Sequence, residues 1–71
     1  MTNSKLLIRF IEKCGFTREA FADKLGISRQ SLHKKLCNRT EFRQSEIKKT
    51  TQLLNLTSEQ EKEIFFADFV D

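Results

Sequence analysis

The chain has 71 residues, of which 38% are hydrophobic and 32% charged, and its formal net charge is +3. This length corresponds to one domain with a small core, and the composition excludes a disordered tail. No apolar run approaches the roughly 20 residues of a membrane span, and the N-terminus lacks the apolar stretch of a signal peptide. Proline is absent and glycine occurs twice, which argues against turn-rich sheets. We therefore expect one all-α domain over residues 1–71, located in the cytosol and without a membrane partner.

Charge is distributed unevenly along the chain. Residues 1–50 hold twelve Lys and Arg against five acids, which gives a net charge of +7. Residues 51–71 hold one Lys against five acids, which gives −4. A basic body with an acidic tail suggests one surface for a polyanion and another surface for a different partner.

The first predicted helix covers residues 4–14, where apolar residues recur at helical spacing. Ser4 is the expected N-cap, and Gly15 is placed to end the helix. The expected role of this helix is structural, because its apolar stripe can close a core. The stripe consists of Leu7, Phe10, Ile11 and Cys14.

A second predicted helix covers residues 18–25 and ends at a tight turn. Thr17 is placed to cap it, and Phe16 and Phe21 occupy the two positions of a hydrophobic staple. Gly26 follows at once, where a left-handed residue ends a helix without a Cβ clash. This helix and the next one are therefore predicted to be joined by one short turn.

The third predicted helix, over residues 28–37, carries an outer face of unusual composition. Ser28 is placed to cap it, while Leu32 and Leu36 lie one turn apart and define the buried side. The segment contains no acidic residue, although a merely solvated helix is expected to carry both signs of charge. Arginine can bridge O6 and N7 of guanine, and glutamine can pair with N6 and N7 of adenine. The residues that face outward are Arg29, Gln30, His33, Lys34 and Cys37.

The two helices and their turn carry a characteristic spacing, Ala-x3-Gly-x5-Leu, formed by Ala22, Gly26 and Leu32, with Ile27 in the turn. This pattern resembles the helix-turn-helix of the Cro and lambda-repressor type. The continuation to Glu41 and Phe42 resembles small Cro-like regulators of temperate phages. The resemblance implies a compact five-helix, lambda-repressor-like DNA-binding domain. Its helices would cover about 4–14, 18–25, 28–37, 44–54 and 58–67.

The resemblance also implies a set of DNA contacts. The helix over residues 28–37 would lie in the major groove, where its N-terminal residues reach deepest. In the resembled family, the DNA backbone is contacted by the start of the helix that corresponds to residues 18–25. It is also contacted by the loop that follows the helix corresponding to residues 28–37. Base contacts are expected from Arg29, Gln30, His33 and Lys34. Backbone contacts are expected from Arg18, Ser28, Ser31, Lys35, Arg39, Thr40 and Arg43.

Several of these residues have a simpler explanation beside the functional one. Arg18 is equally well explained as a solvated charge. His33, the only histidine, is expected to have no cysteine or carboxylate at i+4, and therefore to be an exposed helix residue without a catalytic or metal-binding role. Arg43 stands where a Ser or Thr would pair with Glu46 in a capping box. Either Arg43 is present because it contacts a phosphate, or the helix simply begins without a favourable N-cap residue. Asn38 stands where the resembled family usually has glycine, and it tolerates the left-handed conformation.

The last two predicted helices cover residues 44–54 and 58–67. The first faces inward through Ile47, Thr50 or Thr51, and Leu54, and Phe42 is expected to anchor the preceding loop on the core. Thr57 and Gln60 match a capping box at the start of the second. Two explanations of its apolar end stay open: core closure by Ile64 and Phe65, or a protein-binding surface. The candidates for that surface are Ile64, Phe65, Phe66, Phe69 and Val70.

These observations favour a sequence-specific, double-stranded-DNA-binding transcriptional regulator of phage Cro or repressor type. Dimerisation on two half-sites is expected for so small a domain, and the host compartment would be the bacterial cytosol. The alternative is an antirepressor that docks onto a phage repressor through the acidic, Phe-rich C-terminal region. An enzyme has no support, because no nucleophile–base set or phosphate-binding glycine loop occurs. We expect no cofactor and no metal, since Cys14 and Cys37 lie too far apart for a zinc site and should stay reduced.

Overall fold

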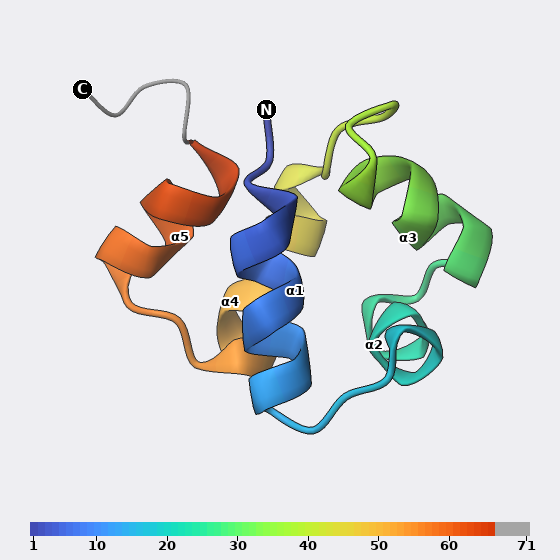
Figure 1. The fold of residues 1–71 in the computed structure, drawn as a ribbon, viewed down its shortest axis with the longest axis horizontal. Coiled ribbons are helices and arrows are strands. Elements are labelled where there is room, and N and C mark those ends of the chain that lie inside the picture. The colour runs from blue at the N-terminus through green and yellow to red at the C-terminus, as the bar shows by residue number, and fades with distance from the viewer. Residues whose placement is uncertain (67–71) are drawn as a thin grey trace.

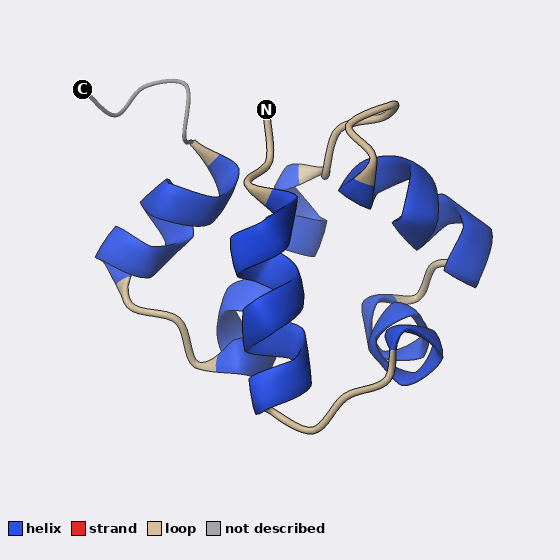
Figure 2. Ribbon diagram, viewed as in Figure 1, coloured by secondary structure: helices blue, strands red, loops and turns tan. Residues whose placement is uncertain are grey.

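Five helices form the described part of the chain, residues 1–66 (Figure 1). In a computed structural model of the protein, no strand occurs within these residues (Figure 2). The predicted all-α, five-helix architecture is confirmed. None of the described helices is long and apolar enough to cross a membrane. The helices are α1 (Ser4–Lys13), α2 (Arg18–Leu25), α3 (Arg29–Leu36), α4 (Gln44–Leu54) and α5 (Ser58–Phe65).

The predicted helix bounds agree closely with the observed ones. Those of α2 and α4 are identical, whereas α3 is shorter by one residue at each end because Ser28 and Cys37 are its caps. α1 ends at Lys13, one residue earlier than predicted, and α5 ends at Phe65, two residues earlier than predicted, with Phe66 as its C-cap.

Three of the four connections between helices use the same three-residue arrangement. A left-handed residue ends one helix, an apolar residue follows and packs on the core, and a Ser or Thr caps the next helix. After α2, for example, Gly26 has a φ of +76°, and the Ile27 N–H donates to the Ala22 carbonyl at 3.0 Å. This pairing satisfies helix carbonyls that would otherwise lack a donor. The three connections are Gly15-Phe16-Thr17, Gly26-Ile27-Ser28 and Asn55-Leu56-Thr57.

The predicted caps of α2, α3 and α5 are confirmed. The side chains of Thr17, Ser28 and Thr57 each accept the N–H three residues on, and Gln60 completes the predicted capping box with the Thr57 N–H at 2.9 Å. The Phe16 and Phe21 rings meet edge to face with centroids 5.8 Å apart. That contact is the predicted staple.

The N-cap of α1 is Asn3, so the prediction of Ser4 is wrong. The Asn3 side chain accepts the Leu6 N–H at 3.3 Å. Ser4 is the first residue of the helix, and its hydroxyl donates to the Leu36 carbonyl at the end of α3. The Asn3 N–H donates to the Ile64 carbonyl at 2.7 Å, which ties the start of α1 to α5. Ser4 is therefore used for a long-range contact that local sequence does not reveal.

The core lies between the five helices. In Figure 1, α1 runs through the middle of the view, with α5 on one side and α2 and α3 on the other. On α4, Thr50 is fully buried and Thr51 only partly, which decides between the two predicted positions. In the predicted α1 stripe, Phe10 is half-buried and Cys14 is exposed. The buried apolar residues are Leu7, Ile11, Phe21, Ala22, Leu25, Leu32, Leu36, Phe42, Ile47, Leu54, Leu56, Ile64 and Phe65.

The apolar end of α5 closes the core. Ile64 is 0% exposed and Phe65 is 7% exposed, so core closure, the first of the two explanations left open, holds for both, and neither is an exposed interface residue. Phe42 anchors its loop as predicted, because its ring lies edge to face with that of Phe65 at a centroid distance of 5.3 Å. Phe66 is half-buried against the core. The other two interface candidates, Phe69 and Val70, lie outside the described residues.

Candidate nucleic-acid interface

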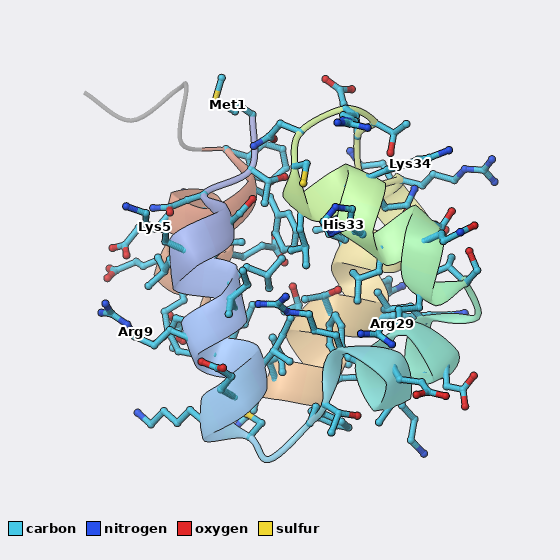
Figure 3. All side chains as sticks on the ribbon, turned by 45° about the vertical axis from the view of Figure 1, so that its right-hand side comes forward. Met1, Lys5, Arg9, Arg29, His33 and Lys34 are labelled. Atoms are coloured by element: carbon cyan, nitrogen blue, oxygen red, sulfur yellow. The ribbon has the colours of Figure 1, made fainter. Side chains whose placement is uncertain are left out.

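The outer face of α3 is cationic. Leu32 and Leu36 bury one side of the helix, which leaves the other side to solvent. The first turn of α3 contains no acidic residue, so the helix itself supplies no side chain that offsets the positive end of its dipole. Figure 3 shows side chains of this face on α3, with Lys5 and Arg9 of α1 on the other side of the view. The exposed residues of the face are Arg29, Gln30, His33 and Lys34, as predicted.

A hollow of about 640 Å³ lies over this face. It brings together residues of three segments: the start of α2, the outer side of α3 and the loop that follows α3. None of its lining residues is acidic, and four carry a permanent positive charge. A concave surface of one charge sign concentrates its field, so this surface suits an anionic ligand. The residues of this cationic hollow are Arg18, Arg29, Gln30, Leu32, His33, Lys34 and Arg39.

The loop at residues 37–43 differs from the other three connections. It is longer, and its exposed residues include Arg39, Thr40 and Arg43. Arg39 lines the cationic hollow, whereas Thr40 and Arg43 do not. Two further predicted backbone contacts, the exposed Ser28 and the half-buried Ser31, also lie outside its lining.

Asn38 fastens the end of α3 to the N-terminal residues. Its φ of +60° confirms the predicted left-handed conformation. Its side chain accepts the Thr2 N–H at 2.8 Å and donates to the Thr2 carbonyl at 3.2 Å. Glycine would adopt the same backbone conformation but could make neither bond. Asn38 thus has a positive role that the comparison with glycine did not suggest.

Lys35 is an internal residue, so its prediction as a backbone contact is wrong. Its side chain is 10% exposed, and its ammonium nitrogen lies 3.2 Å from the equally buried carboxylate of Glu46. The physical reason lies in the helix register: Lys35 follows Leu32 by three residues and therefore lies on the buried side. That spacing, together with an acid at the start of the next helix, is the signal that could have identified the pair.

Glu46 also completes half of a capping box at the start of α4. Its Oε1 accepts the Arg43 N–H at 2.9 Å. Arg43 has no hydroxyl with which to return the bond, as the sequence predicted. The same carboxylate oxygen therefore serves both the Arg43 N–H and the Lys35 ammonium group.

His33 was expected to have no cysteine one turn further along its helix, and this expectation is wrong. Cys37 lies one turn further along, and its Sγ is 3.6 Å from the His33 Nε2. Both cysteines are free thiols. Two ligands fall short of the three or four that a zinc site needs. Residues 1–66 contain no group of three or more His, Cys, Asp or Glu able to hold a metal ion.

Residues 1–66 thus form a small five-helix, all-α structure with a concave cationic face over α3. The chain belongs to the family described as "Protein of unknown function (DUF739)", which matches residues 2–68. A comparison with curated proteins finds no match to this chain. The family match includes all five helices and every residue of the cationic hollow.

Proposed function

We propose that this protein binds double-stranded DNA in a sequence-specific manner and regulates transcription, in the way of phage Cro and repressor proteins. The single observation that carries the proposal is the acid-free cationic hollow along α3. Duplex DNA carries one negative charge per about 1.7 Å of its axis, so a positive concave surface favours it. The resemblance of residues 17–38 to a helix-turn-helix supports the same ligand.

Base reading is assigned to the exposed residues of α3. Arg29 and Gln30 lie in its first turn, and their side chains have the donors and acceptors that guanine and adenine edges match. His33 and Lys34 lie one turn later and line the same hollow. We assign these four residues to direct base contact.

Backbone contact is assigned to residues around α3. Arg18 at the start of α2 and Arg39 in the loop after α3 both line the hollow, and Arg43 is exposed at the end of the loop. The exposed residues Ser28 and Thr40 and the half-buried Ser31 complete the proposed set, from which Lys35 is withdrawn. Three to five neutralised phosphates would give a slope of log K against log[salt] of about −3 to −4.5.

A homodimer on two half-sites, centred about 34–36 Å apart, would supply the contacts that a single small domain lacks. We expect sedimentation of the protein with its selected duplex to give two copies per site. The setting proposed for this activity is the cytosol of a bacterial host. Docking onto a phage repressor through the C-terminal region has less support, because Ile64 and Phe65 are core residues.

The test compares two single arginine deletions. A duplex is first selected from a random-sequence pool with the wild-type protein, and binding is then measured by fluorescence anisotropy. Arg29→Ala should lose about 1–3 kcal/mol on the selected duplex and relax the preference at one base pair. Arg9→Ala removes another exposed arginine, from α1 and outside the hollow, and should change binding little. Equal losses for both variants, or no duplex binding at low salt, would refute the proposal.

A further inference from the structure

We infer that Lys35 and Glu46 form an internal clamp that positions the loop at residues 37–43 against α3. The inference rests on the proposed function, because it makes Lys35 a positioning residue for DNA binding that does not itself touch DNA. It explains how the loop that contacts the DNA backbone keeps a fixed position relative to the helix that contacts the bases.

The clamp joins three segments through one ammonium group. Lys35 Nζ of α3 lies 3.2 Å from Glu46 Oε1 of α4 and 3.4 Å from the carbonyl oxygen of Glu41 in the loop. Glu46 Oε1 also accepts the N–H of Arg43, the last residue of the loop, at 2.9 Å. The loop is therefore fixed at its middle and at its end by the same pair of charged side chains.

Stability alone does not explain this pair. Removing two charges from water is costly, and replacing a buried ion pair by neutral groups of similar size is often neutral or stabilising. Directional contacts do, however, specify one arrangement of the elements that they join. Both side chains are buried, each with 10% of its surface exposed, so the surrounding core restricts the positions of the ammonium and carboxylate groups.

The segment held by the clamp carries three of the proposed backbone contacts. Arg39, Thr40 and Arg43 lie after Lys35 and before Glu46, and all three are exposed. Phosphate contacts set the register of a protein on its duplex. If the loop moves relative to α3, the phosphate contacts and the base contacts can no longer be made together.

The main test uses the double variant Lys35→Met/Glu46→Gln, which keeps the net charge unchanged. Methionine keeps an unbranched side chain, and glutamine keeps an oxygen that can accept the Arg43 N–H. No buried charge is left without a partner, so the variant should fold. Single Lys35→Met is measured beside Lys48→Met, which removes one exposed positive charge from α4 outside the cationic hollow.

The first measurement needs no DNA. In the double variant, amide hydrogen exchange at Arg39, whose N–H donates to the Lys34 carbonyl at 2.9 Å, should become at least about tenfold faster than in the wild type, while core amides of α1 stay unchanged. Unchanged exchange in the loop would overturn the clamp, whatever the protein binds.

The second measurement is a double-mutant cycle on a mixed-sequence duplex. If the clamp positions Arg39, then Arg39→Ala should weaken binding at least about threefold less in the double variant than in the wild type. A direct phosphate contact by Lys35 predicts the opposite: additive losses, and a salt slope that falls by about one in Lys35→Met alone. Additivity would therefore overturn the inference.

The two proposals fail in different ways. If the wild type binds no duplex, the proposed function fails and the exchange experiment still decides whether the clamp orders the loop. If the wild type binds and the cycle is additive, the function stands and the clamp fails. Lys48→Met should change neither loop exchange nor the effect of Arg39→Ala.

Discussion

Replacing Thr50 by valine should stabilise this protein. Thr50 is 0% exposed, and its hydroxyl oxygen has no hydrogen-bond partner within the described residues. A buried polar group without a partner costs about 1–3 kcal/mol, and valine has nearly the same shape as threonine without the hydroxyl. The two residues have similar helix propensities, so the backbone term is small. We expect the free energy of unfolding to rise by about 1–2 kcal/mol, and the Tm by about 4–8 °C for each kcal/mol.

The neighbouring residue supplies a matched control of opposite sign. The Thr51 hydroxyl donates to Glu61 Oε2 at 2.6 Å, which joins α4 to α5. Thr51→Val should therefore lower the free energy of unfolding by about 1 kcal/mol. Urea denaturation followed by circular dichroism measures both variants. A loss of stability in Thr50→Val would refute the reasoning, because it would mean that the Thr50 hydroxyl has a partner in solution.

Two further substitutions test how the ends of the loop are held. Asn38→Gly keeps the left-handed backbone but removes both bonds to Thr2, so the free energy of unfolding in urea should fall by about 0.5–1.5 kcal/mol; an increase would show that relief of backbone strain outweighs the two bonds. Phe42→Ala removes the ring that packs on Phe65 and should cost about 3–5 kcal/mol. That loss would be visible as partial unfolding at 37 °C by circular dichroism, and a fully folded variant would show that the loop can do without this anchor.

Local signals in the sequence were sufficient to locate the helices. The bounds of α2 follow from Thr17 and Gly26, whose hydroxyl and missing Cβ act within one helical turn of where they stand. The acid-free outer face of α3 could likewise be predicted, because Leu32 and Leu36 fix which side is buried. Such features depend on residues three or four positions apart, and periodicity reports them directly.

The predictions that were wrong or incomplete share a different physical origin. Ser4 was predicted as a cap and Lys35 as a DNA-backbone contact, but each makes its bond to a residue distant in sequence or in another helix. Asn38 was judged only for its backbone, while its side chain contacts a residue 36 positions away. Hydrogen bonds of this kind leave no periodic trace in the sequence, so only the folded arrangement reveals them.

All three of these contacts lie at the C-terminal end of α3, and this location has a consequence for the proposed function. α3 has eight residues and buries only Leu32, Lys35 and Leu36, so apolar packing gives it few contacts. Apolar contact is non-directional and would let so short a helix rotate about its axis. Directional bonds to Ser4, to Thr2 through Asn38, and to Glu46 through Lys35 oppose that rotation from three segments. If the outer face of α3 contacts bases, then the orientation of that face depends on polar residues that do not themselves contact the DNA.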